Sequence, residues 1–348
     1  MTQAPPGSIG RGVGLALASA VAFGVTAPIV AWAGAAPLTA AALLYAGAAL
    51  AAFAMRPFAA RAGARLGRAE ALTVVAIAVI GAAIAPALLA FGLGRAGATA
   101  GSLALNLEAP LTVGLAWLVW REPIGRRVLL AGAAMVTGGA LVAFDAGRSS
   151  VGLIGVIAVG GATLAWALDN TLSRRLAECD PLDVVGAKAT LGATLAMIVG
   201  RALGEPLPEL GRIAALMACG ATGYGVSLRL YLLAQRRIGA ARTASVFAVA
   251  PFLGAAIGWA AGSGDPGMLT AIGAAGFALG VWLHVTEHHE HDHVHEAVAH
   301  EHAHRHDDGH HDHTHEPPVR GEHSHAHQHA RVVHAHAHAP DVHHGHAH

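Results

Sequence analysis

The feature that most constrains the fold is a series of ten apolar stretches of about twenty residues, which follow one another almost without a break from Gly12 to His284. A helix of that length crosses about 30 Å of hydrocarbon. Hydrophobic residues make up 54% of the chain and charged residues 13%, too few charges to cover a water-soluble surface. The sequence therefore predicts an all-α integral membrane protein with ten transmembrane helices. Their expected ranges are 12–33, 37–55, 70–93, 97–120, 128–144, 151–172, 183–200, 213–233, 239–261 and 268–284.

The arginines between these stretches predict the orientation in the membrane. Twelve lie on the side of the N-terminus and four on the other side, and positive charge collects on the cytoplasmic side. Both termini are therefore expected in the cytoplasm. Arginine also outnumbers lysine 21 to 1, which with heavy alanine and glycine usage suggests a GC-rich bacterial genome and a bacterial inner membrane. The twelve are Arg11, Arg56, Arg61, Arg65, Arg68, Arg121, Arg126, Arg127, Arg174, Arg175, Arg236 and Arg237, and the four are Arg95, Arg148, Arg201 and Arg212.

The two halves of the apolar region resemble one another at an offset of 141 to 143 residues. Each half holds five helices, and because five is odd, the second half is expected upside down relative to the first, as in secondary transporters. The prolines matched in this way each remove a helix hydrogen bond, so they indicate either a helix kink at a cavity or a simple packing kink. The matched positions are Phe23 with Trp166, Gly97-Ala98 with Gly239-Ala240, Pro110 with Pro251, and Glu122-Pro123 with Asp265-Pro266.

These residues resemble a known family. The paired Gly-Ala and proline positions, the sequence Trp120-Arg121-Glu122-Pro123, and Trp166-Ala167-Leu168-Asp169-Asn170 are similar to those of the EamA-type drug/metabolite transporters. The resemblance implies a ten-helix inner-membrane permease that moves small organic solutes, often outward, without covalent chemistry. One departure is Gly262-Ser263-Gly264-Asp265-Pro266, where that family usually carries a glutamate.

One carboxyl group is predicted at the centre of the fourth stretch, at Glu108 beside Asn106. An ionised carboxylate at that depth is costly unless it is paired or protonated, so such residues commonly mark a proton, ion or substrate path. The repeat partner of Glu108 is Val249, which argues against a packing origin shared by both halves. A structural ion pair or a protonated carboxyl bonded to a neighbouring helix is the alternative. Arg229 and Arg242 are the candidate counter-charges.

Other polar residues interrupt the second half. Asp169 and Asn170 in the sixth stretch and Lys188 in the seventh are expected to meet across a helical hairpin. A salt bridge that closes the inner side is the favoured interpretation, and direct substrate contact is the alternative. Tyr224 lies between two glycines in the eighth stretch, either as a substrate contact or as a packed core residue.

The C-terminal region has a different composition. All 25 histidines lie between His284 and His348, alternating with acidic and small residues and without large apolar ones. Such a segment cannot bury a core, so we expect disorder. Neutral imidazoles beside carboxylates are ligands for Zn²⁺, Ni²⁺, Co²⁺ or Cu²⁺. Two alternative interpretations are a tail that responds to pH and a solvated extension without a function of its own. The densest ligand run comprises His334, His336, His338, Asp341, His343, His344, His346 and His348.

The expected organisation is a first five-helix repeat at 1–146, a second at 147–285 and the histidine-rich tail at 286–348. The leading hypothesis is a secondary transporter, in the direction of export, for a small solute or metabolite, with a tail that binds or senses metal. A transition-metal efflux carrier and a membrane-tethered metal buffer are the alternatives. The first of these would have few metal ligands in its helices, because residues 12–283 contain no histidine and the expected intramembrane carboxylates are Glu108 and Asp169. We expect a lipid bilayer and a solute as partners, no nucleic acid, no required cofactor and no enzymatic activity, and a homodimer stays open.

Overall fold

The computed structural model describes residues 6–59, 63–120, 125–146, 150–176, 179–238, 243, 246–263 and 267–285, together with four tail segments at 290–295, 299–304, 323–328 and 332–337. The chain divides into two compact units, Met1–Glu287 and His288–His348.

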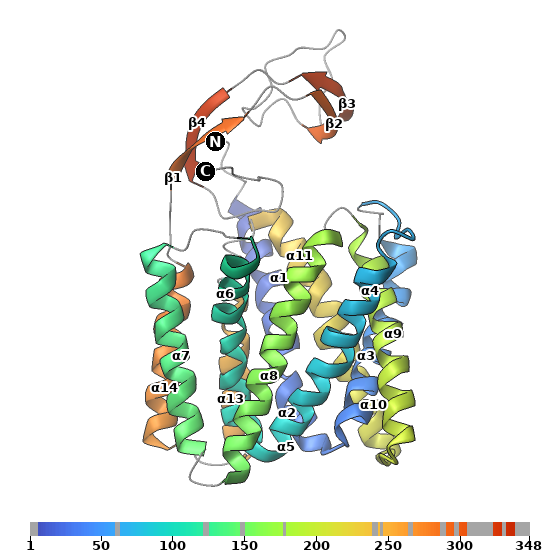
Figure 1. The fold of residues 1–348 in the computed structure, drawn as a ribbon, viewed down its shortest axis with the longest axis vertical. Coiled ribbons are helices and arrows are strands. Elements are labelled where there is room, and N and C mark those ends of the chain that lie inside the picture. The colour runs from blue at the N-terminus through green and yellow to red at the C-terminus, as the bar shows by residue number, and fades with distance from the viewer. Residues whose placement is uncertain are drawn as a thin grey trace. The chain divides into compact units, whose positions relative to one another are not determined.

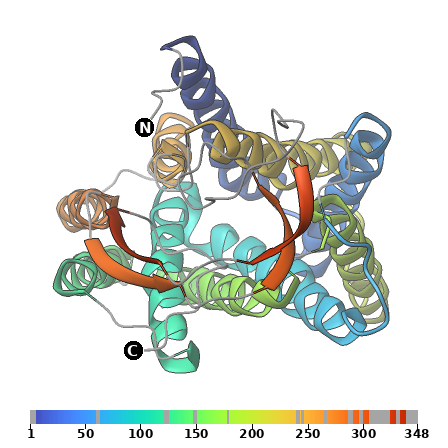
Figure 2. The same cartoon turned by 90° about the horizontal axis from the view of Figure 1, so that it is seen from above.

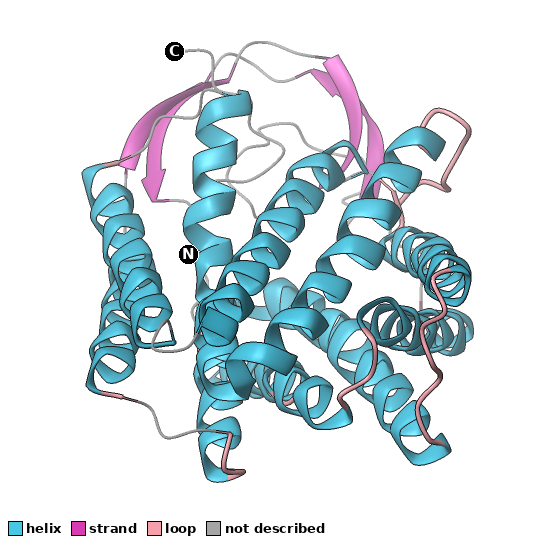
Figure 3. Ribbon diagram, turned by 60° about the horizontal axis from the view of Figure 1, so that its bottom comes forward, coloured by secondary structure: helices cyan, strands magenta, loops and turns pink. Residues whose placement is uncertain are grey.

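The first unit is a bundle of helices (Figures 1 and 3). Seven helical runs in its described part are long and apolar enough to cross a membrane, and two shorter apolar helices follow at Ala250–Ala260 and Met268–Leu283. The α-helices are α1 (Pro6–Gly24), α2 (Thr26–Ala33), α3 (Pro37–Met55), α4 (Ala71–Ile77), α5 (Ala85–Ala104), α6 (Glu108–Trp120), α7 (Arg126–Ala146), α8 (Ser150–Ser173), α9 (Pro181–Ala202), α10 (Leu210–Gly220), α11 (Ser227–Ile238), α13 (Ala250–Ala260) and α14 (Met268–Val285). The 3₁₀ turns are η1 (Arg56–Phe58), η3 (Leu105–Leu107) and η4 (Arg174–Leu176), and the π-helical segments are η2 (Ala78–Ile84) and η5 (Ala221–Val226).

One of the seven runs, Ala71–Val119, has 49 residues and is broken at Gly97. A straight helix of that length would measure about 70 Å, more than twice the thickness of a bilayer core. Gly97 has a φ of 77°, a left-handed value that glycine adopts without steric cost. A β-carbon there would also lie 3.0 Å from the Ser263 carbonyl oxygen. The break separates the predicted third and fourth stretches.

The π-helical segments lie at matched positions in the two halves. They begin at Ala78 and Ala221, which are 143 residues apart, the offset of the sequence repeat. A π turn widens the helix and changes which backbone carbonyls remain available for other partners, and such turns are frequent at functional sites. The two halves of the chain thus share a π-helical segment as well as a similar sequence.

Helices that correspond between the halves pack against one another in opposite directions. The Glu205 carboxylate, just after α9, accepts hydrogen bonds at the start of α3 from Leu38 N at 3.2 Å and Thr39 N at 2.7 Å. At the other end, Arg56 after α3 bonds Asp180 before α9 at 2.8 Å. The end of each helix therefore meets the beginning of its repeat partner.

The same arrangement recurs for α7 and α14, which lie side by side in Figures 1 and 2. Asp145 near the end of α7 accepts bonds from Thr270 N at 3.1 Å and Thr270 Oγ1 at 2.6 Å, near the start of α14. Elsewhere α5 packs on α8, and α1 packs on α11 through hydrogen bonds between Ser19 and Ser227. The core between these helices is built mainly from alanine, leucine and glycine, which allow close approach.

The second unit contains four short strands in two antiparallel pairs: β1 (Glu290–His295) with β4 (Val332–Ala337), and β2 (Ala299–His304) with β3 (His323–Gln328). Disorder was expected for the whole tail, and in these four segments the structure has extended strands. The strict alternation of histidine with other residues has the period of an extended strand, and Val332 and Val333 favour that backbone. Pairing places histidine opposite histidine, as in His291 with His336 and His293 with His334.

Candidate functional site

Glu108 is the first residue of α6, directly after the 3₁₀ turn η3. Its side chain is half-buried, and its Oε1 accepts a hydrogen bond from Asn170 Nδ2 at 2.9 Å. Asn170 belongs to α8, so this bond connects a helix of the first half with a helix of the second. One alternative for Glu108 was a protonated carboxyl group bonded to a neighbouring helix. The structure contains a hydrogen bond from Glu108 to a neighbouring helix.

The residue beside Asn170 makes a second contact on α8. Asp169 is 3% exposed, and its Oδ2 forms an ion pair with Lys188 Nζ on α9. Ser173 Oγ lies 3.4 Å from its other oxygen. The predicted contact between Asp169 and Lys188 across the α8–α9 hairpin is confirmed. Consecutive residues of one helix thus join α8 to both α6 and α9.

The polar group formed by Glu108, Asp169, Asn170 and Lys188 contains two acidic side chains and one basic side chain. Asp169 and Lys188 neutralise one another, whereas Glu108 has no cation within ion-pair distance among the described residues. Arg229, on α11, makes no ion pair with Glu108, and Arg242 lies outside the described residues.

A group of aromatic side chains lies around the same position. Tyr45 Oη on α3 and Trp166 Nε1 on α8 both donate to the carbonyl oxygen of Gly81, at 2.8 Å and 3.0 Å. Gly81 lies inside the π-helical segment η2, and a β-carbon there would collide with the Asp169 carboxylate. The sequence singled out none of these roles. Two sequence features pointed to Trp166: its repeat match with Phe23 and its place in the family-like segment Trp166–Asn170.

Tyr224 stands at the centre of the aromatic group, inside η5. Its ring centroid lies 5.8 Å from that of Phe23, 5.4 Å from that of Tyr45 and 6.4 Å from that of Trp166. Its hydroxyl is buried and has no hydrogen-bond partner within 3.5 Å among the described residues, although the Thr26 side chain is close enough to influence it. We define Phe23, Tyr45, Trp166 and Tyr224 as the aromatic cluster.

The remaining predicted residues have local roles. Asn106 is buried, and its Nδ2 donates to the Leu103 carbonyl oxygen at 3.0 Å, within its own turn. Pro110 and Pro251 lie in the first turns of α6 and α13, each after an interruption of the α-helix. In a first turn the missing proline N–H leaves no helix bond unmade. Asn106 does not reach Glu108 or Asp169 by any hydrogen bond in the described chain.

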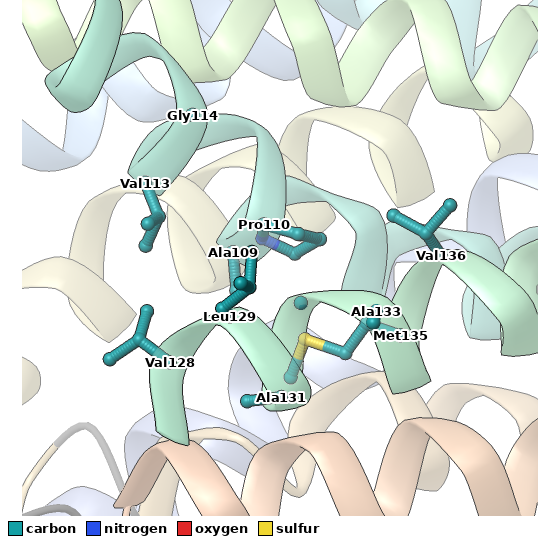
Figure 4. A pocket seen from close by; sticks show the side chains of 11 residues that line it. Ala109, Pro110, Val113, Gly114, Val128, Leu129, Ala131, Ala133, Met135 and Val136 are labelled. Carbon is teal, nitrogen blue, oxygen red and sulfur yellow. The ribbon is translucent and has the colours of Figure 1, made fainter. Parts of the chain in front are cut away.

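The helical unit has two pockets of note, one beside Glu108 in sequence and one at a loop. One, of about 330 Å³, lies between α6 and α7 and is lined by apolar side chains that include Ala109, Pro110 and Met135 (Figure 4). Leu129 and Val136 on its wall are more than half exposed, which is expected of a lipid-facing groove. The other, of about 290 Å³, lies near Arg212 and the loop after α9. Neither pocket includes Glu108.

The predicted metal ligands fall in the second unit. His334 and His336 belong to β4, and His338, Asp341, His343, His344, His346 and His348 lie outside the described residues. Where the structure describes side chains, no group of three histidine, cysteine, aspartate or glutamate residues is arranged to hold a metal ion.

The helical unit is similar in sequence to known proteins. The sequence matches the EamA-like transporter family over residues 10–144 and again over 153–286. A protein of Methanothermobacter thermautotrophicus described as an uncharacterized transporter is 28% identical over 200 residues, which cover 55% of this chain and 58% of that protein. The chain thus spans little more than half the length of this relative.

A solved crystal structure of a protein shares the fold at a TM-score of 0.58 and 18% identity, covering 79% of this chain and 96% of the other. The family match occupies most of the chain and repeats once within it. The chain therefore belongs to the EamA-like transporter family, as a multi-pass integral membrane protein.

Proposed function

We propose that this protein is a secondary carrier that exports a small organic solute by alternating access around Glu108. The observation that carries the proposal is the hydrogen bond between Glu108 and Asn170, because it joins the two halves through an ionisable group within apolar helices. Carboxyl groups in such positions serve as proton or ion relays in transporters. Family membership supports transport as the activity.

The carrier has ten membrane crossings in two inverted five-helix repeats, at 1–146 and 147–285. Support comes from the break at Gly97 inside a run too long for one crossing, and from the antiparallel packing of α3 on α9 and of α7 on α14. The proposed location is a bacterial inner membrane, and the arginine distribution supports an orientation with both termini in the cytoplasm.

Glu108 acts as the coupling residue in this carrier. Protonation removes its charge and weakens its hold on the Asn170 amide, since a neutral acid accepts a weaker hydrogen bond than a carboxylate. The ion pair of Asp169 with Lys188 holds α8 to α9 while this exchange occurs. Alternating access requires such a bond between halves to break and reform in each cycle.

The carrier is tested with the full-length protein in liposomes containing a pH-sensitive dye. A panel of amines, amino acids, organic anions and neutral metabolites is added in turn, and proton movement is recorded for the wild type, for Glu108→Gln and for the matched control Glu209→Gln on the surface. We expect at least one solute to move protons in the wild type and in the control, and none in Glu108→Gln. Equal transport by Glu108→Gln would end the assignment to Glu108.

We further propose that the tail at 286–348 binds divalent transition metals in the cytoplasm. The register that pairs histidine with histidine at alternate positions of β1–β4 and β2–β3 supports this, because it brings potential metal-binding residues of distant tail segments together. The experiment compares cell-associated Ni²⁺, Co²⁺ and Zn²⁺ in the wild type, a tail deletion and Glu108→Gln. An effect of the deletion alone indicates metal buffering or sensing, and an effect of both variants indicates metal efflux. No effect in either variant would exclude a metal role.

A further inference from the structure

We propose that the β2–β3 ladder of the tail is an ordered transition-metal site, in which histidines are the only protein ligands and come from both strands. This inference rests on the proposed metal binding by the tail and names the site and its ligands. It comes from the register of the two strands, which separates histidine from acidic residues between the two faces of the ladder.

Every histidine of β2 and β3 lies opposite a histidine of the partner strand. The pairs are His300 with His327, His302 with His325, and His304 with His323. Directly opposed residues of an antiparallel pair share one face, and so do residues two apart along a strand. All six residues therefore belong to the same face of the ladder, which we call the histidine face.

The other face of the ladder carries the remaining residues. These are Ala299, Glu301 and Ala303 on β2 and Ser324, Ala326 and Gln328 on β3. The one acidic residue of this ladder, Glu301, thus belongs to the face without histidine. A site on the histidine face has imidazole ligands, which suit Zn²⁺, Ni²⁺ and Cu²⁺, whereas Mg²⁺ and Ca²⁺ require oxygen ligands.

The spacing of the histidine face suits an ion that is held by three or four ligands. Opposed residues of an antiparallel pair have Cα atoms about 4.5 to 5.5 Å apart, and residues two apart on a strand are about 7 Å apart. Zn²⁺ takes histidine ligands at about 2.0 to 2.1 Å in a tetrahedral arrangement, and three histidines are enough to hold it. Two neighbouring pairs supply four. His302 and His325 form the middle pair, so they belong to either group of four on this face.

Metal binding at this face is coupled to the pairing of two segments that are separated in the chain. β2 ends at His304, and β3 begins at His323. An ion with ligands from both strands binds the paired state and therefore stabilises it. A two-stranded ladder alone is marginally stable in water, so this stabilisation should be measurable. We expect Zn²⁺ to hold the two strands together as well as to bind to them.

The test is equilibrium dialysis of the purified full-length protein against Zn²⁺ alone, with two exchanges that conserve composition. His325→Ala combined with Ala326→His keeps the number of histidines and moves one of them to the other face, opposite Glu301. This exchange should weaken the tightest Zn²⁺ binding at least about tenfold, because loss of even a hydrogen-bond partner of a metal ligand costs that much. His313→Thr combined with Thr314→His is the matched control outside the described strands, and it should leave the affinity unchanged.

Glu301→Gln tests whether the acidic residue is a ligand. A site made of histidines alone predicts unchanged Zn²⁺ affinity in this variant, since Glu301 belongs to the other face. A loss as large as that of the His325 exchange would overturn the assignment of histidines as the only protein ligands.

Hydrogen exchange of residues 299–304 and 323–328 adds a measurement that depends on strand pairing. Zn²⁺ should slow exchange in both strands of the wild type, because the bound ion stabilises the paired state. It should slow exchange much less in the variant that moves His325. Zn²⁺ binding that leaves exchange in both wild-type strands unchanged would overturn the site shared between them.

The dialysis distinguishes failure of this inference from failure of metal binding by the tail. If the His325 exchange binds Zn²⁺ as tightly as the wild type, and alanine at the four histidines of 343–348 weakens binding instead, the tail binds metal and the β2–β3 site falls. If the wild type binds no more Zn²⁺ than the tail deletion, metal binding by the tail falls as well. Weaker binding by the His325 exchange and unchanged binding by its control support both.

Discussion

At the scale of single residues, a small number of polar side chains connect the helices inside this bundle. Asp169 and Asn170 are neighbours on α8, yet they bond to α9 and α6 respectively. Gly81 receives two side-chain donors at its carbonyl oxygen and leaves room for the Asp169 carboxylate where a β-carbon would stand. Each of these residues is therefore sensitive to change for a different physical reason.

Gly81→Ala should destabilise the protein, because the added methyl group collides with the carboxylate of Asp169. The expected loss is about 1 to 3 kcal/mol, the usual range for overpacking. Gly160→Ala on α8 is the matched control, since a β-carbon there meets nothing within 4 Å, and it should be neutral or stabilising by up to about 1 kcal/mol. Thermal unfolding in detergent, followed by size-exclusion chromatography, measures both. Equal melting of the two variants would contradict the steric argument.

Lys188→Met should be strongly destabilising, by about 3 to 5 kcal/mol, because it leaves the Asp169 carboxylate buried without its partner. The double variant Asp169→Asn with Lys188→Met removes both charges and should recover most of this loss. The same thermal assay compares the single and double variants. A double variant as unstable as Lys188→Met would show that the loss does not come from leaving the Asp169 carboxylate without its partner.

At the scale of helices, the sequence predicted more of the fold than of the site. Apolar length alone located the seven helical runs that can cross a membrane in the described part of the chain. The spacing of Asp169 and Lys188 on adjacent helices was enough to predict their contact. The bonds of Tyr45 and Trp166 to Gly81 could not be predicted, since a backbone carbonyl leaves no mark in the sequence. Nor could the π-helical segments, because their residues are compatible with an ordinary α-helix.

Glu205→Ala should loosen the start of α3, because its carboxylate accepts hydrogen bonds from Leu38 N, Thr39 N and Thr39 Oγ1. The expected cost is about 1 kcal/mol, as for other helix caps. Glu209→Ala is the control, since Glu209 precedes α10 without a side-chain capping bond. Hydrogen exchange of the first turn of α3 should accelerate in the first variant only. Unchanged exchange there would exclude the capping role.

At the scale of the whole molecule, the chain consists of a helical unit with its own core and a tail unit of different composition. The large buried cluster is drawn from helices of both halves and includes Leu44, Leu89 and Phe277. All of its members precede Glu287. The stability of the helical unit should therefore be independent of the tail.

Deletion of residues 288–348 should leave the melting temperature of the protein in detergent unchanged within error, because no member of the buried cluster is removed. The same deletion should abolish most Ni²⁺ binding measured by equilibrium dialysis. A large fall in melting temperature would show that the tail contributes to the folding of the helical unit.

The two π-helical segments have a consequence for which length changes the chain tolerates. A π turn accommodates one residue more than an α-helix of the same span, so deletion of a single residue within Ala221–Val226 would regularise that helix. Because the extra residue is taken up within the π turn itself, the side chains beyond such a deletion would keep nearly the same direction. Deletion of one residue should thus be better tolerated in these two segments than elsewhere in the helices, where it would rotate every side chain beyond it by about 100° and bring one face of the helix out of phase with its neighbours.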